Sequence, residues 1–259
     1  MLRKYLIVVL VSAALVSSAA ARELARSFTT SPLEWRRGIA IVPDATMGRA
    51  VNALVDTGSS TELKSKYPKD FQTYYRGLDI QEAVGGDFIA THALTLNSVS
   101  SGAQRISLDV RTAKNFTSSF ITCVVAGRKL IMLFDSAAFA WPVGRAHASP
   151  FGVSLLRATR FRELRNRFPS WQYHSAELEI PNESGKFVRA ASLLAPKMQI
   201  GARTVGPVLF VERTDDRTFR QLKKLYALEV DGDLGIAALQ AAGLKIDYPN
   251  GLLVVQPEP

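Results

Sequence analysis

The chain has 259 residues, which is enough to bury a sizeable core in one large domain or two small ones. Its 47% hydrophobic and 21% charged residues are typical of a globular protein and argue against a disordered tail, a collagen-like fibre or a multi-span membrane protein. A single cysteine excludes a disulfide framework and a cysteine-rich zinc site, and the net charge of +9 suits anionic surfaces without indicating a chemistry.

The N-terminal segment has the three parts of a secretory signal peptide. Two basic residues precede an apolar stretch at 5–16, and small residues follow as far as an Ala-x-Ala that ends at Ala21. The apolar stretch is shorter than the roughly 20 residues of a membrane-spanning helix, although an uncleaved anchor is the alternative. We therefore expect residues 1–21 to be a signal peptide, residues 22–35 to be a linker, and the protein to be exported to the periplasm or secreted. A buried, inert Cys123 would suit that compartment.

Most of the remaining chain alternates apolar and polar residues with a period of two, which predicts β-strands. Turn-forming residues separate the strands and predict hairpins. We expect hairpins with turns at 43–48, 85–87 (within a hairpin over 79–96), 181–185 and 249–251, and further strands near 105–111, 119–126, 129–135, 197–200 and 206–212.

Three segments have the period of a helix instead. The first is expected over 154–167, the second begins after Thr214 or Asp215, and a short third one runs over 236–242 and ends at Gly243. The fold class is therefore predicted to be mainly β with a few short helices.

The chain contains a weak internal repeat. Residues 48–58 and 127–137 each begin with Gly-Arg, continue as an apolar strand, and end with an aspartate, a hydroxyl residue and a small residue. This duplication predicts two lobes, which we place at 36–120 and 121–259.

The two repeated aspartates, Asp56 and Asp135, each close an apolar strand, where an unpaired charge is costly to bury. If the lobes face each other, the two carboxyl groups meet, and like charges at that distance cannot both ionise. The pair would then hold one shared proton. One carboxylate could take a proton from water while the other carboxyl group polarises a carbonyl, without any metal or cofactor.

Residues 55–60, Val-Asp-Thr-Gly-Ser-Ser, resemble the active-site motif of pepsin-like and retropepsin-like aspartic proteases. Gly85 and Gly86 look like the glycine-rich flap hairpin of the retroviral-type members, and residues 231–248 are similar to the closing segment of a bacterial retropepsin-like lobe. The resemblance implies the two-lobed β-barrel architecture of the acid proteases, here in an exported bacterial-type member.

The resemblance also implies an activity, namely the hydrolysis of peptide bonds in a peptide or protein substrate by a monomer without cofactors. Asp56 and Asp135 would be the catalytic pair, and the flap residues Gly85 and Gly86 would cover the bound peptide. The hydroxyl groups of the two motifs would tie the active-site loops together. The residues assigned to these loops are Thr57, Gly58, Ser59 and Ser136.

The chain departs from the family pattern at two positions of the second lobe. Ala137 stands where the family usually has glycine, and Asp233 places a charge in an apolar slot. The first lobe has no counterpart of the latter segment between residues 97 and 120. Two alternatives therefore stay open. One is a homodimeric enzyme that pairs two copies of Asp56, and the other is a protease-fold protein that binds peptides without cutting them.

Other chemistry-bearing residues are interpreted as structural or solvated. The three histidines are far apart in sequence, so no metal site is expected. The basic segment 154–167 is interpreted as a solvated helix face, with contact to an anionic envelope surface as the alternative, and export argues against nucleic acid as a partner. The residues concerned are His92, His147 and His174, and Arg157, Arg160, Arg162, Arg165 and Arg167.

Overall fold

The computed structural model describes residues 30–32, 34–36, 39–46, 50–57, 82–84, 93–96, 103–113, 116–144, 150–182, 186–239, 244–247 and 250–255. The chain divides into two units, residues 1–30 and 31–259, and the account below concerns the second unit. The predicted signal peptide, residues 1–21, lies outside the described residues.

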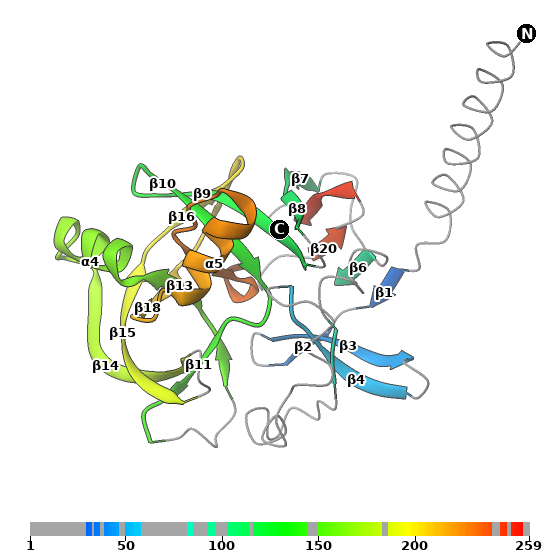
Figure 1. The fold of residues 1–259 in the computed structure, drawn as a ribbon, viewed down its shortest axis with the longest axis horizontal. Helices are drawn as coiled ribbons and strands as arrows, with labels where there is room; N and C mark the ends of the chain where they lie inside the picture. The colour runs from blue at the N-terminus through cyan, green and yellow to red at the C-terminus, as the bar shows by residue number, and fades with distance from the viewer. Residues whose placement is uncertain are drawn as a thin grey trace, which may run out of the picture. The chain divides into compact units, whose positions relative to one another are not determined.

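Strands make up most of the described chain (Figure 1), so the predicted mainly β class is confirmed. The strands up to residue 125 are β1 (Thr30–Pro32), β2 (Glu34–Arg36), β3 (Ile39–Thr46), β4 (Ala50–Val55), β5 (Glu82–Val84), β6 (Ala93–Leu96), β7 (Gln104–Ser107), β8 (Asp109–Ala113) and β9 (Phe116–Val125). Those that follow are β10 (Arg128–Asp135), β11 (Phe139–Pro142), β12 (Phe151–Gly152), β13 (Ser154–Arg157), β14 (Gln172–Pro181), β15 (Phe187–Ala195), β16 (Met198–Ile200), β17 (Arg203–Val205), β18 (Val208–Arg213), β19 (Gly232–Gly235), β20 (Leu244–Asp247) and β21 (Leu252–Val255). The helices are α4 (Ala158–Arg167), α5 (Arg217–Tyr226) and the 3-10 helix η2 (Ile236–Leu239).

The largest sheet has the strand order β12-β11-β14-β15-β18-β13-β19-β10-β9-β16-β17, with β8 paired to β9. At its centre β10 is antiparallel to β9 and parallel to β19, and β19 is in turn antiparallel to β13. Two smaller sheets have the orders β2-β3-β4-β5 and β1-β6-β20-β21-β7. The three sheets therefore combine strands from distant parts of the sequence.

Strand β19 fits between β10 and β13 because glycine stands at both of its ends. A Cβ atom at Gly232 would meet the carbonyl oxygen of Leu155, and one at Gly235 would meet the carbonyl oxygen of Val153. Only glycine allows two backbones to approach this closely. These two glycines thus hold the intervening Asp233 at one fixed place in the sheet.

The main hydrophobic cluster lies around β9 and β10 and contains the fully buried Cys123. Burial raises the pKa of the Cys123 thiol to about 12. The thiol is therefore protonated at neutral pH and shielded from reagents, in keeping with the inert role expected for it.

Three predicted hairpins are present, and one is not. Strands β3 and β4, β14 and β15, and β20 and β21 pair as expected. The hairpin predicted over 79–96 is wrong, since β5 pairs in parallel with β4 whereas β6 pairs with β20. Its apolar residues find partners in other strands instead of in each other, which local sequence alternation cannot reveal.

The predicted helix over 154–167 is wrong in its first turn. Residues Ser154–Leu156 are buried in strand β13 between β18 and β19, and the helix α4 begins only at Ala158. The last predicted helix, 236–242, is described as the short 3-10 helix η2. Pairing on both sides of β13 outweighs the helical spacing of the sequence.

The proposed lobe boundary near residue 120 falls inside a strand, because β9 runs from Phe116 to Val125. Strands β6 and β7 from the first half also pair with β20 and β21 from the C-terminal end. In the part of the chain that the structure describes, no helix is long and apolar enough to span a membrane.

Candidate active site

The same local arrangement occurs at the ends of strands β4 and β10. Strand β4 ends at Val55, directly before Asp56, and β10 ends at Asp135 itself. Each strand has a parallel neighbour, β5 or β19, in which Val84 lies opposite Val55 and Gly235 lies opposite Asp135. The apolar residues before each aspartate are buried, so both carboxyl groups emerge where a core strand stops.

The counterpart of β19 in the first repeat is β5, which lies before the range 97–120. Strand β5, directly before Gly85, has the same parallel pairing to β4 that β19 has to β10. The glycines assigned to a flap, Gly85 and Gly86, lie outside the described residues.

Thr57 and Ser136 join the two loops by four reciprocal hydrogen bonds. The Oγ1 of Thr57 donates to the carbonyl oxygen of Phe134 at 2.6 Å and accepts from the amide of Ser136 at 2.9 Å. The Oγ of Ser136 donates to the carbonyl oxygen of Val55 at 2.6 Å and accepts from the amide of Thr57 at 3.0 Å. Both hydroxyl residues are buried, so water does not compete for these bonds. The loops that begin with Asp56 and Asp135 are thereby held side by side within one chain.

The environment of Asp135 favours its protonated form. Burial raises the pKa of this carboxyl group well above its usual value, and the negative charges of Asp56 and Asp233 raise it further. Two weaker influences lower the pKa: a hydrogen bond of 2.9 Å from the amide of Ala137 to Oδ1, and the positive charge of Arg213. Asp56 itself is half-buried. The surroundings of Asp135 therefore favour a proton on this carboxyl group, next to the charge of Asp56.

The alanine at position 137 does not strain the second loop. Among the described residues other than glycine, a positive φ occurs at Ala126, Ala176 and Ala227. Ala137 is not one of them, so its backbone conformation is open to any L-residue. The Cβ that departs from the family pattern is accommodated without backbone strain.

A third carboxyl group, Asp233, belongs to the same site. Its side chain is 1% exposed, and its Oδ2 accepts a hydrogen bond of 2.9 Å from Nη1 of Arg213. Burial raises the pKa of Asp233, Arg213 lowers it, and Asp56 raises it. Asp233 stands out in the sequence as a departure from the family pattern, whereas Arg213 does not. One feature of the sequence could have identified Arg213. It is a charged residue at the end of the apolar strand β18, just as Asp56 and Asp135 stand at the ends of apolar strands.

Other predicted site residues are placed as follows. Gly58, Ser59, His92 and His147 lie outside the described residues. His174 contacts Glu177 at 3.1 Å on the surface of β14. Within the described ranges, no group of three or more His, Cys, Asp or Glu side chains could hold a metal ion.

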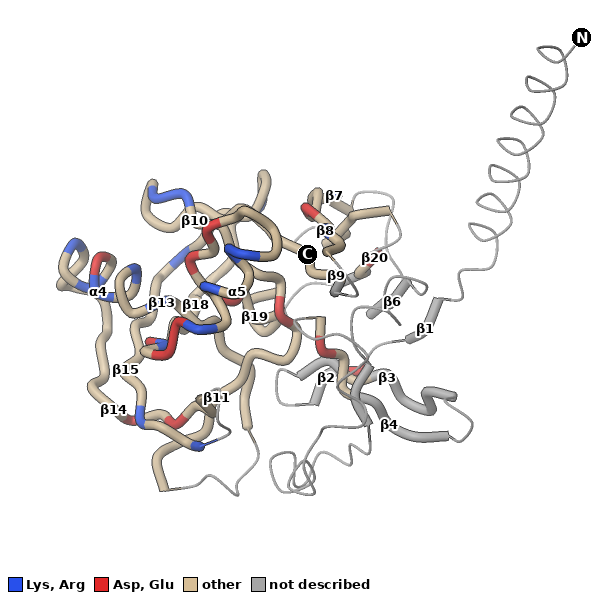
Figure 2. The backbone as a smooth tube through the Cα atoms, in the orientation of Figure 1, with Lys and Arg blue, Asp and Glu red and all other residues tan. Residues whose placement is uncertain are grey.

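The arginines of the basic segment, whose positions on β13 and α4 are blue in Figure 2, have partners within the chain. Arg160 contacts both Asp231 and Glu163 at 2.6 Å, and Arg165 lies over the ring of Tyr173 at 3.7 Å. The remaining contacts are Arg157 with Glu229 and Asp216, Arg162 with Glu212, and Arg167 with the ring of Phe168. An envelope contact through this helix stays a prediction.

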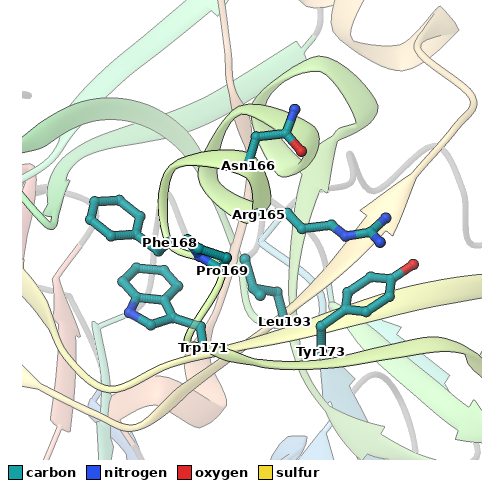
Figure 3. Close-up of a pocket in the computed structure, with 7 residues that line it drawn as sticks. All are labelled: Arg165, Asn166, Phe168, Pro169, Trp171, Tyr173 and Leu193. Carbon is teal, nitrogen blue, oxygen red and sulfur yellow. The ribbon is translucent and has the colours of Figure 1, made fainter.

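A pocket of about 510 Å³ lies at the C-terminal end of α4 (Figure 3). Phe168 and Trp171 stack on each other at 4.6 Å, while Arg165 lies over Tyr173. The polar groups of the lining belong to Arg165, Asn166, Trp171 and Tyr173. None of the three aspartates lines this pocket, and its lining contains no carboxyl group to activate water. This pocket is therefore separate from the three aspartates.

No protein-family model matches the chain, and no curated protein matches its sequence. Among solved structures, the chain is similar to the crystal structure of a retropepsin-like aspartic protease from Rickettsia conorii. The match has 18% identity and a TM-score of 0.36, and it covers 61% of this chain and 92% of that one.

Proposed function

We propose that the protein is an aspartic endopeptidase that hydrolyses peptide bonds with a water activated between Asp56 and Asp135. The observation that carries this proposal is the set of reciprocal hydrogen bonds between Thr57 and Ser136. These bonds hold together two loops that each begin with an aspartate at the end of a buried strand. The raised pKa of Asp135 beside Asp56 further supports a pair that shares one proton.

In this proposal Asp56 and Asp135 have different tasks. Ionised Asp56 takes a proton from the water molecule, whose oxygen forms a bond to the peptide carbonyl carbon. Protonated Asp135 gives its proton to the carbonyl oxygen, which yields a tetrahedral intermediate. That intermediate collapses when Asp56 passes its proton to the peptide nitrogen, the C–N bond breaks, and Asp135 recovers its own proton. Each aspartate thus returns to its initial state without a metal or cofactor.

The single-chain version of the enzyme is favoured over a homodimer. The hydrogen bonds that join the loops run between residues of one chain, 79 positions apart in sequence. The paired aspartates of this proposal are therefore Asp56 and Asp135, not two copies of Asp56. We expect activity per molecule to be unchanged when the protein is diluted.

The direct test is digestion of an unfolded protein at acidic to neutral pH. We expect internal cleavage, and we expect a statine-type compound, which mimics the tetrahedral intermediate, to block it. The matched control is the same scaffold without the statine hydroxyl, which should inhibit far less. Peptide binding in a calorimeter without any cleavage product would contradict the proposal and point to the peptide-binding alternative.

We also propose that the enzyme acts after export, as a periplasmic or secreted protein. The support is the basic, apolar and small-residue order of residues 1–21. We expect the mature protein to begin at Arg22, which N-terminal sequencing of the protein expressed from the full gene would check. A mature protein that still begins at Met1 would contradict cleavage at this position.

A further inference from the structure

Asp233 and Asp135 lie on the same face of the central parallel pair. Asp233 is opposite Leu133, and Gly235 is opposite Asp135. Side chains alternate between the two faces of a strand, so residues two apart share a face. Asp135 is two residues beyond Leu133, which makes it a diagonal neighbour of Asp233.

Arg213 reaches Asp233 from the same face of the sheet. Leu155 of β13 lies opposite both Asp233 of β19 and Val211 of β18, and Arg213 is two residues beyond Val211. Its guanidinium therefore extends across β13 to the carboxylate, with an Nη1–Oδ2 distance of 2.9 Å. On its other side the guanidinium contacts α5, where it lies 5.6 Å from the centre of the Phe219 ring.

The Asp233–Arg213 pair is not explained by stability alone. Buried ion pairs stabilise only when their remaining polar atoms are also satisfied. Here the buried Oδ1 of Asp233 and Nε of Arg213 have no hydrogen-bond partner among the described residues. An apolar pair of similar volume would hold β19 and β18 together at less cost. The two buried charges of Asp233 and Arg213 therefore point to an electrostatic effect on neighbouring groups.

The charges that act on Asp233 come from a small set of groups. Asp135 lies beside it on β10, Arg213 faces it from β18, and Asp56 acts from the first active-site loop. Strand β13 presents Leu155 to Asp233, and its Arg157 lies opposite Arg213 and 5.8 Å from the centre of the same Phe219 ring. Helix α5 presents uncharged Thr218 and Phe219 to the guanidinium of Arg213. The other nearby charged residues in the described ranges are paired elsewhere: Asp231 with Arg160, Glu229 with Arg157, and Glu212 with Arg162.

We propose that Asp233, held by Arg213, is a positioning residue for the aspartate pair that keeps the shared proton bound up to higher pH. This inference rests on the proposed function. A negative charge beside Asp135 makes loss of the shared proton more costly, and Arg213 opposes this effect more weakly. The pair thus extends catalysis to a higher pH than burial and the charge of Asp56 alone would allow.

The test is the pH profile of kcat/KM for Asp233→Asn. Without Asp233, the charge of Arg213 favours ionisation, so the alkaline limb should move to lower pH by about one unit. The double variant Asp233→Leu/Arg213→Leu carries no unpaired charge and should fold even if the single variant does not. Its alkaline limb should also move to lower pH, but by less, because the opposing charge of Arg213 is removed as well.

The matched control is Asp109→Asn, which makes the same substitution in the exposed ion pair of Asp109 with Arg111 and should leave the profile unchanged. An unmoved alkaline limb in both Asp233 variants would overturn this inference, since a merely structural role would change stability without moving the limb. Activity that does not depend on Asp56 would instead overturn the proposed function. The two failures are therefore distinguishable.

Discussion

Asp56→Asn should lower kcat/KM for peptide hydrolysis by about a thousandfold, because an amide cannot take the proton from the attacking water. The carboxamide has nearly the same volume as the carboxyl group, so folding should be preserved. The rate is measured with an unfolded protein or a quenched peptide, and circular dichroism checks the fold. Asp109→Asn, at an exposed site, should retain full activity. Full activity in Asp56→Asn would exclude the proposed mechanism.

The same substitution at Asp135 separates the single-chain enzyme from the dimeric alternative. A single-chain pair requires both carboxyl groups, so Asp135→Asn should be as inactive as Asp56→Asn. A homodimer that uses two copies of Asp56 would leave Asp135→Asn nearly fully active. The intramolecular hydrogen bonds of Thr57 and Ser136 lead us to expect the first outcome.

Asp135→Asn should also be more resistant to unfolding than the native protein at neutral pH. Because its pKa is raised in the folded state, Asp135 binds more protons when folded than when unfolded. The free energy of unfolding therefore falls as pH rises from the usual aspartate pKa toward the raised one. Asparagine does not titrate and removes this loss. A melting temperature equal to that of the native protein across this range would contradict the assignment.

Thr57→Val should lower the free energy of unfolding by about 2–5 kcal/mol, because it removes the hydroxyl group at the centre of the contact between the loops. Valine has nearly the shape of threonine but can neither donate to the carbonyl oxygen of Phe134 nor accept from the amide of Ser136. Both backbone groups would remain buried without a partner, at a cost of about 1–3 kcal/mol each.

Urea unfolding measures this loss, and Thr57→Ser is the matched control. Serine keeps the hydroxyl group and both hydrogen bonds and loses only a methyl group, so its effect should be much smaller. Thr57→Val should also reduce activity, since the two aspartates are no longer held in register. Equal stability of the valine and serine variants would show that the loops are joined by other contacts.

The local sequence determines much of the fold around the site. Period-two alternation predicts the mainly β class and three of the hairpins, and the repeated strand-Asp-hydroxyl pattern identifies Asp56 and Asp135 as candidates. These features depend on a few neighbouring residues, so a single sequence is enough to predict them. The pairing partner of a strand cannot be predicted in this way, because alternation fits a parallel neighbour as well as an antiparallel one. Alternation at 82–84 therefore predicts a hairpin neighbour, whereas β5 pairs in parallel with β4.

By itself, the sequence determined the types of element and the two aspartate motifs, because hydrophobic period and turn residues act over short distances. Only the tertiary structure decided that Thr57 and Ser136 exchange hydrogen bonds, that β13 is a strand, and that Arg213 crosses a strand to reach Asp233. The two contacts join residues far apart in the chain, and the strand β13 depends on burial between two neighbouring strands. Their free energy comes from desolvated hydrogen bonds and charges, which exist only once the sheet has formed.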